Sequence, residues 1–487
     1  MDVKRPERAS LQGAWDVGHE RHLNTRLDGP QSSLRGIEAG SMKDERPNVI
    51  FVFGDQWRAQ ATGYAGDPNV HTPNLDALAR ESLVFKNAVS GCPVCSPARA
   101  SIMTGRYPLT HGVFLNDVYL KPRSPSIAHV YREAGYDTAY IGKWHLDGHG
   151  RSSFIPPERR QGFRYWRAME CTHDYNNSYY YADEPVKLRW EGYDAFAQTR
   201  EAIRYMRHAR RRGPFLLFLS WGPPHSPYDT APKEYQELYE PDEIVLRPNV
   251  PEACQDQARR DLAGYYAHIS ALDACVGELV EALEDLGIVD DTLLVFTSDH
   301  GDMHGSQGQW RKQSPWDESI LIPLVMRYPA VLRRGETDLP INTPDLVPTI
   351  LGLTGLEVPS TVEGRDYSAH LVEGRETGDI AALIACYTPF AEWWRDRGGR
   401  EYRGVRTQRY TYVRSLDGPW LLYDNISDPY QMNNLSQDPS YAEVAQLLDD
   451  ELSRLLRQTK DRFEPAQTLL DRYGLVTDER GAVPYTP

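Results

Sequence analysis

Acidic, basic and imidazole side chains follow four short apolar runs of this sequence. Their types suit metal binding or proton transfer, and they are Asp55 and Gln56, Lys143 and His145, His225, and Asp299 and His300. In an open α/β sheet, ligands bind beyond the carboxyl ends of the strands. Packing alone would not place carboxylate, imidazole and ammonium groups at four such ends. The sequence therefore predicts one polar site assembled there.

Residues 92–106 supply another candidate group, a pair of cysteines with Cys-x-x-Cys spacing. Taken alone, this spacing fits a redox pair or half of a zinc site. No second pair follows in the sequence, which disfavours zinc. Pro97 can begin a helix, so we expect Cys95 beside a helix N-terminus, where free N–H groups favour an anion. The competing interpretation of Cys95 is a buried structural thiol, which is the role we expect for Cys92.

The stretch Cys95-Ser-Pro-Ala-Arg99, followed by Thr104-Gly105, resembles the Cys-x-Pro-x-Arg signature of type I sulfatases, a family of the alkaline phosphatase superfamily. The resemblance extends over most of the chain beyond the N-terminal tail. It implies that a formylglycine-generating enzyme oxidises Cys95 to formylglycine, whose hydrated aldehyde attacks the sulfur of a sulfate ester. Arg99 would direct its guanidinium at this nucleophile and at the sulfate oxygens.

Two of the strand-end pairs, Asp55-Gln56 and Asp299-His300, resemble the metal-binding pairs of sulfatases. Together with the formylglycine at Cys95, they would hold one divalent ion, which in this family is usually calcium. Oxygen ligands suit a hard cation that can neutralise the charge of a bound sulfate. Many members have a second aspartate where this chain has Gln56, and asparagine where it has His300. These departures leave fewer negative ligands, so manganese or zinc stays open.

Further motifs resemble the sulfate-binding elements of the family. Lys143 and His145 lie in a Gly-Lys-x-His stretch, His225 follows two prolines, and Lys312 comes after the Asp-His turn. Singly, each would more often be a solvated lysine or a hydrogen-bonded core histidine. We expect His225 or Lys312 to protonate the leaving alcohol and Asp299 to take the proton of the attacking hydroxyl. We expect His145 to accept the proton that is lost when sulfate is released.

Short apolar runs predict strands buried on both faces, at residues 49–53, 138–141, 215–220, 293–296 and 324–326. Apolar residues at every third or fourth position over 262–283, with Gly287 beyond them, predict a long helix. Alternating strands and helices indicate an α/β fold. The resemblance specifies an alkaline phosphatase-like architecture, with a large mixed, mostly parallel sheet sandwiched by helices.

After about Gly364 the pattern changes. Residues 410–413 and 420–423 flank a Gly-Pro pair and predict an antiparallel hairpin, and residues 441–456 predict an amphipathic helix. We therefore predict a disordered tail at 1–44, a catalytic domain at 45–370, and a smaller C-terminal α+β subdomain with an antiparallel sheet at 371–487.

The composition narrows the class of protein. The chain has 487 residues, 40% of them hydrophobic, and a net charge of -15, which argues against a nucleic-acid surface. No run approaches the ~18 apolar residues of a membrane span. The first 44 residues show no secretion signal, so we expect a cytoplasmic protein, or a periplasmic one if translation starts elsewhere, as at Met42. The six scattered cysteines do not form a disulfide framework.

These observations predict a sulfuric ester hydrolase. An aromatic and polar insert at 173–177 and 190–193, with residues 393–395, favours a carbohydrate sulfate as substrate. Ordinary loop packing explains these aromatics equally well. Two other functions stay open: a phosphonate monoester hydrolase or phosphodiesterase of the same superfamily, and a non-catalytic binding protein with unmodified Cys95.

Overall fold

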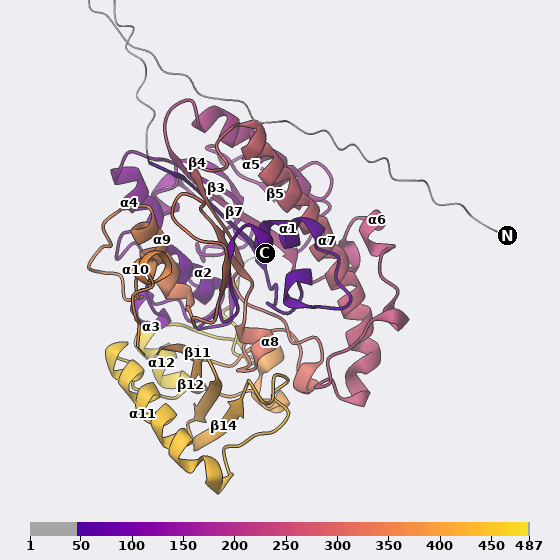
Figure 1. Cartoon of the computed structure of the whole chain (residues 1–487), viewed down its shortest axis with the longest axis vertical. Coiled ribbons are helices and arrows are strands. Elements are labelled where there is room, and N and C mark those ends of the chain that lie inside the picture. Colours follow the sequence, from indigo (N-terminus) through magenta and orange to yellow (C-terminus); the bar gives the residue numbers. More distant parts are fainter. Residues whose placement is uncertain (1–45, 379, 486–487) are drawn as a thin grey trace, which may run out of the picture. The chain divides into compact units, whose positions relative to one another are not determined.

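The computed structural model describes residues 46–378 and 380–485 (Figure 1). The tail predicted at 1–44 lies outside the described residues. The described residues belong to one compact unit. The boundary that we place near residue 370 stays a prediction.

An eight-stranded sheet forms the centre of the unit, in the order β10-β2-β9-β8-β1-β7-β3-β4. Its strands are β1 (Asn48–Asp55), β2 (Leu83–Phe85), β3 (Asp137–Lys143), β4 (Tyr165–Met169), β7 (Phe215–Pro224), β8 (Thr292–Ser298), β9 (Leu324–Arg327) and β10 (Gly335–Thr337). All five runs predicted as strands lie in this sheet. β9 alone is antiparallel to its neighbours β8 and β2, and the other pairings are parallel. The predicted mixed, mostly parallel sheet is confirmed.

Both faces of this sheet are buried, as the uninterrupted apolar runs predict. In β1, Val49, Phe51 and Phe53 point into one hydrophobic core, whereas Ile50 and Val52 point into the other. This alternation follows from the two-residue period of a strand. Figure 1 shows α4 and α9 on one side of the strands and α5 and α7 on the other.

The helices of the unit differ widely in length. They are α1 (Pro73–Arg80), α2 (Cys95–Thr104), α3 (Pro108–His111), α4 (Ile127–Glu133), α5 (Asp194–Ala209), α6 (Lys233–Gln236), α7 (Gln255–Asp285), α8 (Asp317–Ile320), α9 (Leu346–Leu353), α10 (Ser368–Glu373), α11 (Ala442–Gln458) and α12 (Ala466–Tyr473). The long helix predicted over 262–283 is α7, and Gly287 lies beyond its end with a φ of 62°. Among the described residues, no helix is long and apolar enough to cross a membrane.

Short 3-10 helices connect these elements. They are η1 (Gly63–Ala65), η2 (Pro157–Arg159), η3 (Tyr228–Thr230), η4 (Pro241–Glu243), η5 (Glu252–Cys254), η6 (Ser306–Gly308), η7 (Thr343–Asp345), η8 (Ala391–Trp393), η9 (Arg395–Arg397) and η10 (Pro439–Tyr441). A two-stranded sheet joins β5 (Tyr179–Tyr180) to β6 (Leu188–Arg189).

A second, antiparallel sheet contains β11 (Ala381–Cys386), β12 (Tyr402–Thr407), β13 (Tyr410–Ser415) and β14 (Gly418–Asp424), in that order. The predicted hairpin is β13–β14, but its turn is Leu416-Asp417, because Ser415 pairs with Gly418 and Pro419 already lies in the strand. Leucines of α11 pack against this sheet, as expected for the amphipathic helix predicted at 441–456.

Candidate active site

Neighbouring parallel strands bring the predicted site residues together. β8, β1, β7 and β3 are adjacent in the sheet. They end at Ser298, Asp55, Pro224 and Lys143, which either are site residues or directly precede one. The carboxyl ends of parallel strands meet at one edge, so groups far apart in sequence converge there.

Cys95 lies at the centre of this group, as the first residue of α2. Its Sγ is 2.9 Å from Nζ of Lys312, 3.3 Å from Nε2 of His300 and 3.7 Å from Oδ1 of Asp55. The side chain is 1% exposed. The structure therefore places the predicted nucleophile against two of the predicted metal ligands and one predicted sulfate-binding lysine.

The two cysteines of the Cys-x-x-Cys pair differ electrostatically. Burial and Asp55 oppose ionisation of the Cys95 thiol, but Lys312, Lys143 and His300 outweigh them and hold its pKa well below the ordinary value. Burial raises the pKa of Cys92 to about 12. All six cysteines lie among the described residues and are free thiols. Only Cys95 of the pair has the cationic surroundings of a reactive group.

Asp55 and Asp299 form ion pairs with Arg99 close to the nucleophile. Arg99 donates from Nη2 to Asp55 and from Nε to Asp299, at 2.9 Å in each case, and Nζ of Lys143 lies 2.7 Å from Asp55. Arg99 also donates to the backbone oxygen of Lys143 and to Ser220, at 2.8 Å each. Its guanidinium thus binds the two carboxylates, rather than pointing mainly at the nucleophile as the sequence suggested.

The chemistry of the predicted metal ligands fits a cation. One donor atom each from Asp55, Cys95, Asp299 and His300 lies within 4.8 Å of all the others, and all four residues are buried. His300 Nδ1 donates to the backbone oxygen of Gly301 at 2.9 Å, so Nε2 is the nitrogen that faces the cluster and that a bound ion would deprotonate. Within the described part of the chain, Oε1 of buried Gln56 has no hydrogen-bond partner.

Lys312 and His225 lie together beside Cys95. Lys312 Nζ is 3.2 Å from His225 Nε2, and His225 Nδ1 donates to the backbone oxygen of Ser226 at 2.9 Å. Burial, Lys312 and stacked His173 hold the pKa of His225 well below its ordinary value. Burial opposes the charge of Lys312, but Cys95 and Asp55 outweigh it and raise its pKa. Lys312 therefore carries the proton of this pair, and His225 accepts from it.

His145 forms a second polar relay. Its Nε2 lies 3.3 Å from Oδ1 of Asp117, and Arg151 donates two bonds to the same carboxylate, at 2.9 and 2.8 Å. Burial disfavours the imidazolium, but Cys171 and Asp117 outweigh it and raise the pKa of His145 to about 10. His145 Nδ1 is buried and has no hydrogen-bond partner within the ranges described. Sequence reasoning missed Asp117, because its partner lies 28 positions away.

A third buried carboxylate, Asp302, was also missed. It ends the stretch Thr297-Ser-Asp-His-Gly-Asp302, in which the sequence analysis predicts a role only for Asp299 and His300. Its Oδ2 accepts a 2.6 Å hydrogen bond from Nε2 of Gln56 and another from the hydroxyl of Tyr228. Its proximity in the sequence to Asp299 and His300 is the feature that could have pointed to a role for Asp302.

The aromatic insert is mostly structural. Tyr175, Trp190, Tyr193 and Trp393 are at most 7% exposed, and Trp190 stacks on Tyr180 with ring centroids 4.0 Å apart. For these four residues the packing interpretation is correct, and they do not form a platform for sugar rings. His173 is only partly buried, and its ring stacks on His225 with centroids 4.6 Å apart.

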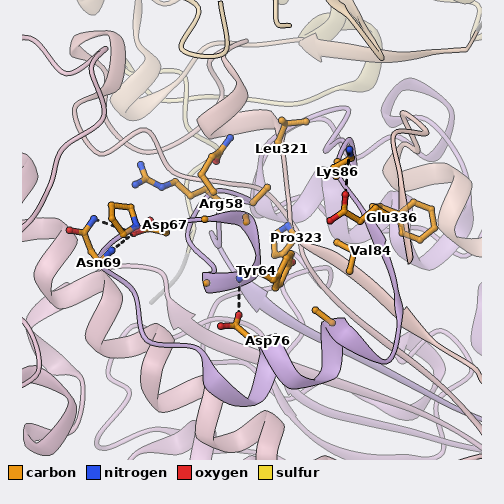
Figure 2. Close-up of a pocket in the computed structure, with 18 of the residues that line it drawn as sticks. Arg58, Tyr64, Asp67, Asn69, Asp76, Val84, Lys86, Leu321, Pro323 and Glu336 are labelled. Carbon is orange, nitrogen blue, oxygen red and sulfur yellow. Dashed lines mark hydrogen bonds and ion pairs between the residues drawn. The ribbon is translucent and has the colours of Figure 1, made fainter. Parts of the chain in front are cut away.

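A cavity of about 1070 Å³ lies elsewhere in the unit, and Figure 2 shows part of its lining, including Arg58, Tyr64, Lys86 and Pro323. None of the predicted site residues lines it. Arg58 follows Gln56 closely in the chain, yet its guanidinium bonds to Tyr266, 3.3 Å away on α7. The candidate site is therefore the strand-end cluster around Cys95.

Two family profiles and several known proteins match this chain. The profile of the Sulfatase family matches residues 47–356, and the profile named N-sulphoglucosamine sulphohydrolase, C-terminal, matches residues 305–458. The chain is 43% identical over 458 residues to the ulvan-active sulfatase of Formosa agariphila, covering 92% of this chain and 89% of the relative.

A curated protein and a solved structure from Bacteroides thetaiotaomicron are also similar to this chain. The endo-4-O-sulfatase is 32% identical over 489 residues, covering 88% of this chain and 95% of the relative. A solved structure, titled for the metabolism of multiple glycosaminoglycans, superimposes with a TM-score of 0.78 at 30% identity, covering 88% of this chain and 99% of that one.

Proposed function

The chain belongs to the sulfatase family of the alkaline phosphatase superfamily, so it is a sulfuric ester hydrolase, and we propose that it desulfates a carbohydrate with a formylglycine made from Cys95 and one divalent ion. The observation that carries this proposal is the position of Cys95. Its sulfur lies between two predicted metal ligands, His300 and Asp55, on one side and the ammonium of Lys312 on the other.

Formylglycine would supply a hydrated aldehyde. Its hydroxyl would lie where the Sγ of Cys95 now lies and would attack the sulfur of the sulfate ester. Cys95 is 1% exposed, so a formylglycine-generating enzyme must reach this segment before the fold closes over it. The ion would be held by Asp55, Gln56, Asp299, His300 and the modified residue, and it would neutralise charge on the sulfate. Mostly oxygen ligands suit calcium, and the imidazole of His300 also admits manganese or zinc.

The chain's own residues divide the remaining tasks. Lys143 and Lys312 supply the positive charge that a sulfate group needs, since the protein as a whole is acidic. Arg99 orients the two carboxylates through its paired 2.9 Å contacts. Burial and Asp55 raise the pKa of Asp299, which suits Asp299 to accept the proton of the attacking hydroxyl.

Lys312 is the better candidate for protonating the leaving alcohol. It is charged, whereas neutral His225 accepts a bond from it and so holds the ammonium in place. The base for sulfate release is assigned to His145, whose Nδ1 has no hydrogen-bond partner in the described part of the chain and is separate from the Nε2 that faces Asp117. Its raised pKa means that this base must lose a proton before it acts.

The substrate class rests on the relatives. One acts on ulvan by its name and another is an endo-4-O-sulfatase, so a sulfated polysaccharide or one of its oligosaccharides is the substrate that we propose. The test is a panel of sulfated saccharides assayed for released sulfate, with Cys95→Ala as the inactive control. Release from aryl sulfate alone, with no saccharide desulfated, would contradict the carbohydrate assignment.

A separate kinetic comparison, of an aryl sulfate with an aryl phosphonate, tests the phosphonate alternative. Both relatives above are sulfatases and at least 32% identical to this chain, which favours sulfate over phosphonate esters. An aryl phosphonate should therefore be cleaved with a lower kcat/KM than the matching aryl sulfate. The binding-protein alternative requires an unmodified Cys95, which mass spectrometry of its tryptic peptide detects.

A further inference from the structure

The side-chain amide of Gln56 is held in one orientation. Gln56 is fully buried and has a left-handed backbone, with φ of 69°. Its Nε2 donates to Oδ2 of Asp302 at 2.6 Å and to the hydroxyl of Tyr228 at 3.3 Å. Its Oε1 has no partner among residues 46–378 and 380–485. The amide nitrogen thus faces the protein, and the oxygen is left for another ligand.

Asp302 is itself fixed. Its Oδ1 accepts the backbone N–H groups of His304 and Arg311, at 3.2 and 3.0 Å, and its Oδ2 accepts the hydroxyl of Tyr228. The guanidinium Nη1 of Arg311 in turn donates to the hydroxyl of Tyr228 at 2.8 Å. Asp302 is 1% exposed, so three protein donors besides Gln56 determine its orientation. An ionised carboxylate offers only acceptors, so it bonds the NH2 end of an amide and not the oxygen end.

We propose that Asp302 is a positioning residue that determines which end of the Gln56 amide faces the divalent ion. This inference rests on the proposed function, because it takes Gln56 as a ligand of that ion. A carboxylate at position 56 would present an oxygen in either orientation. An amide rotated by half a turn would present NH2 to the cation, so Gln56 needs a partner that accepts and never donates.

The first test is Asp302→Asn. If the asparagine oxygen keeps the backbone N–H groups of His304 and Arg311, its NH2 faces the NH2 of Gln56, and the amide must turn its oxygen away from the ion. Loss of such an outer partner typically weakens metal binding by roughly 10- to 100-fold. Isothermal titration calorimetry of the chelator-stripped protein, with Ca²⁺ and with Mn²⁺, measures the metal affinity without any substrate.

The matched control is Asp345→Asn, which alters another buried carboxylate that accepts backbone N–H groups, those of Asn342 and Arg365. It should cost stability and leave metal affinity unchanged. Tyr228→Phe removes one donor to Asp302 and should weaken binding less than Asp302→Asn does. This milder variant keeps the test available if Asp302→Asn does not fold.

The decisive test is compensation. In the double variant Gln56→Glu with Asp302→Asn, the glutamate accepts from the asparagine NH2 and turns its other oxygen to the ion, so affinity should return toward wild type. Gln56→Glu alone places two carboxylates in contact and should not gain affinity. Wild-type affinity in Asp302→Asn, no recovery in the double variant, or no ion binding by the wild type would each overturn the inference. If the wild type binds the ion but releases no sulfate, the proposed function fails while the inference stands.

Discussion

The ammonium of Lys312 lies 2.9 Å from the Sγ of Cys95, the atom whose place the attacking oxygen would take. Lys312 is only 6% exposed and its pKa is raised. A buried, charged lysine at this distance can act in two ways. It can hold the sulfate group, or it can give a proton to the departing alcohol.

These two roles predict different results for Lys312→Ala. If Lys312 is the acid, the variant should lose roughly 10²- to 10⁴-fold more kcat/KM on a sugar sulfate than on an activated aryl sulfate, whose leaving group needs no proton. Steady-state kinetics with one substrate of each kind measures the difference. Lys121→Ala, at an exposed lysine, is the control. A parallel loss on both substrates would leave Lys312 with sulfate binding alone.

The two cysteines of the Cys-x-x-Cys pair should respond differently to alanine. Cys95→Ala should abolish turnover, whereas Cys92→Ala should give an active enzyme with some loss of stability, since both side chains are buried. Mass spectrometry should show that the peptide containing Cys95 has lost sulfur and two hydrogens and gained one oxygen. Equal inactivation of both variants would favour a redox pair instead.

Replacing Asp299 should affect metal content as well as rate. Asp299→Asn removes one of two carboxylates that face the predicted ion and weakens the contact with Arg99. We expect metal affinity to fall by at least roughly tenfold, measured by elemental analysis after dialysis. Asp273→Asn, at a buried carboxylate that caps α1, should retain its metal. Full metal occupancy in Asp299→Asn would remove Asp299 from the ligand set.

The relay behind His145 predicts a pH effect. A base works only when deprotonated, and although burial disfavours the imidazolium, Cys171 and Asp117 hold the pKa of His145 above its ordinary value, so kcat should rise with pH above that ordinary value if sulfate release limits turnover. Asp117→Asn removes an anion that stabilises the imidazolium, so the rising limb should move to lower pH. Profiles of kcat against pH for an aryl sulfate measure the shift.

The control for this experiment is Asp147→Asn, which alters a nearby carboxylate that pairs with Arg159 and not with His145. Its profile should coincide with that of the wild type. An unmoved limb in Asp117→Asn would mean that His145 is not the base.

The large sheet and most residues of the candidate site could be predicted from the amino-acid sequence. Uninterrupted apolar runs identified five of its strands, and the polar residues at or just beyond the ends of β1, β3, β7 and β8 meet at one edge because these strands are parallel. The stretch Cys95-Ser-Pro-Ala-Arg99 resembles the sulfatase signature and so predicts Cys95 as the nucleophile, and Pro97 predicted the helix α2 that begins at Cys95. Such features depend on residues that are close in the chain, so a linear pattern can reveal them.

The hydrogen bonds that hold these groups in place could not be predicted from the sequence. The contact between Gln56 and Asp302 joins residues 246 positions apart, and that between Arg99 and Asp299 joins residues 200 apart. The burial of Trp190 was also not predictable. The polar residues around it in the sequence suit a surface that binds sugar rings, but its ring packs against Tyr180 inside the protein. A side chain's partners depend on which distant segments the fold brings beside it, and the chemistry of the residue alone does not contain that information.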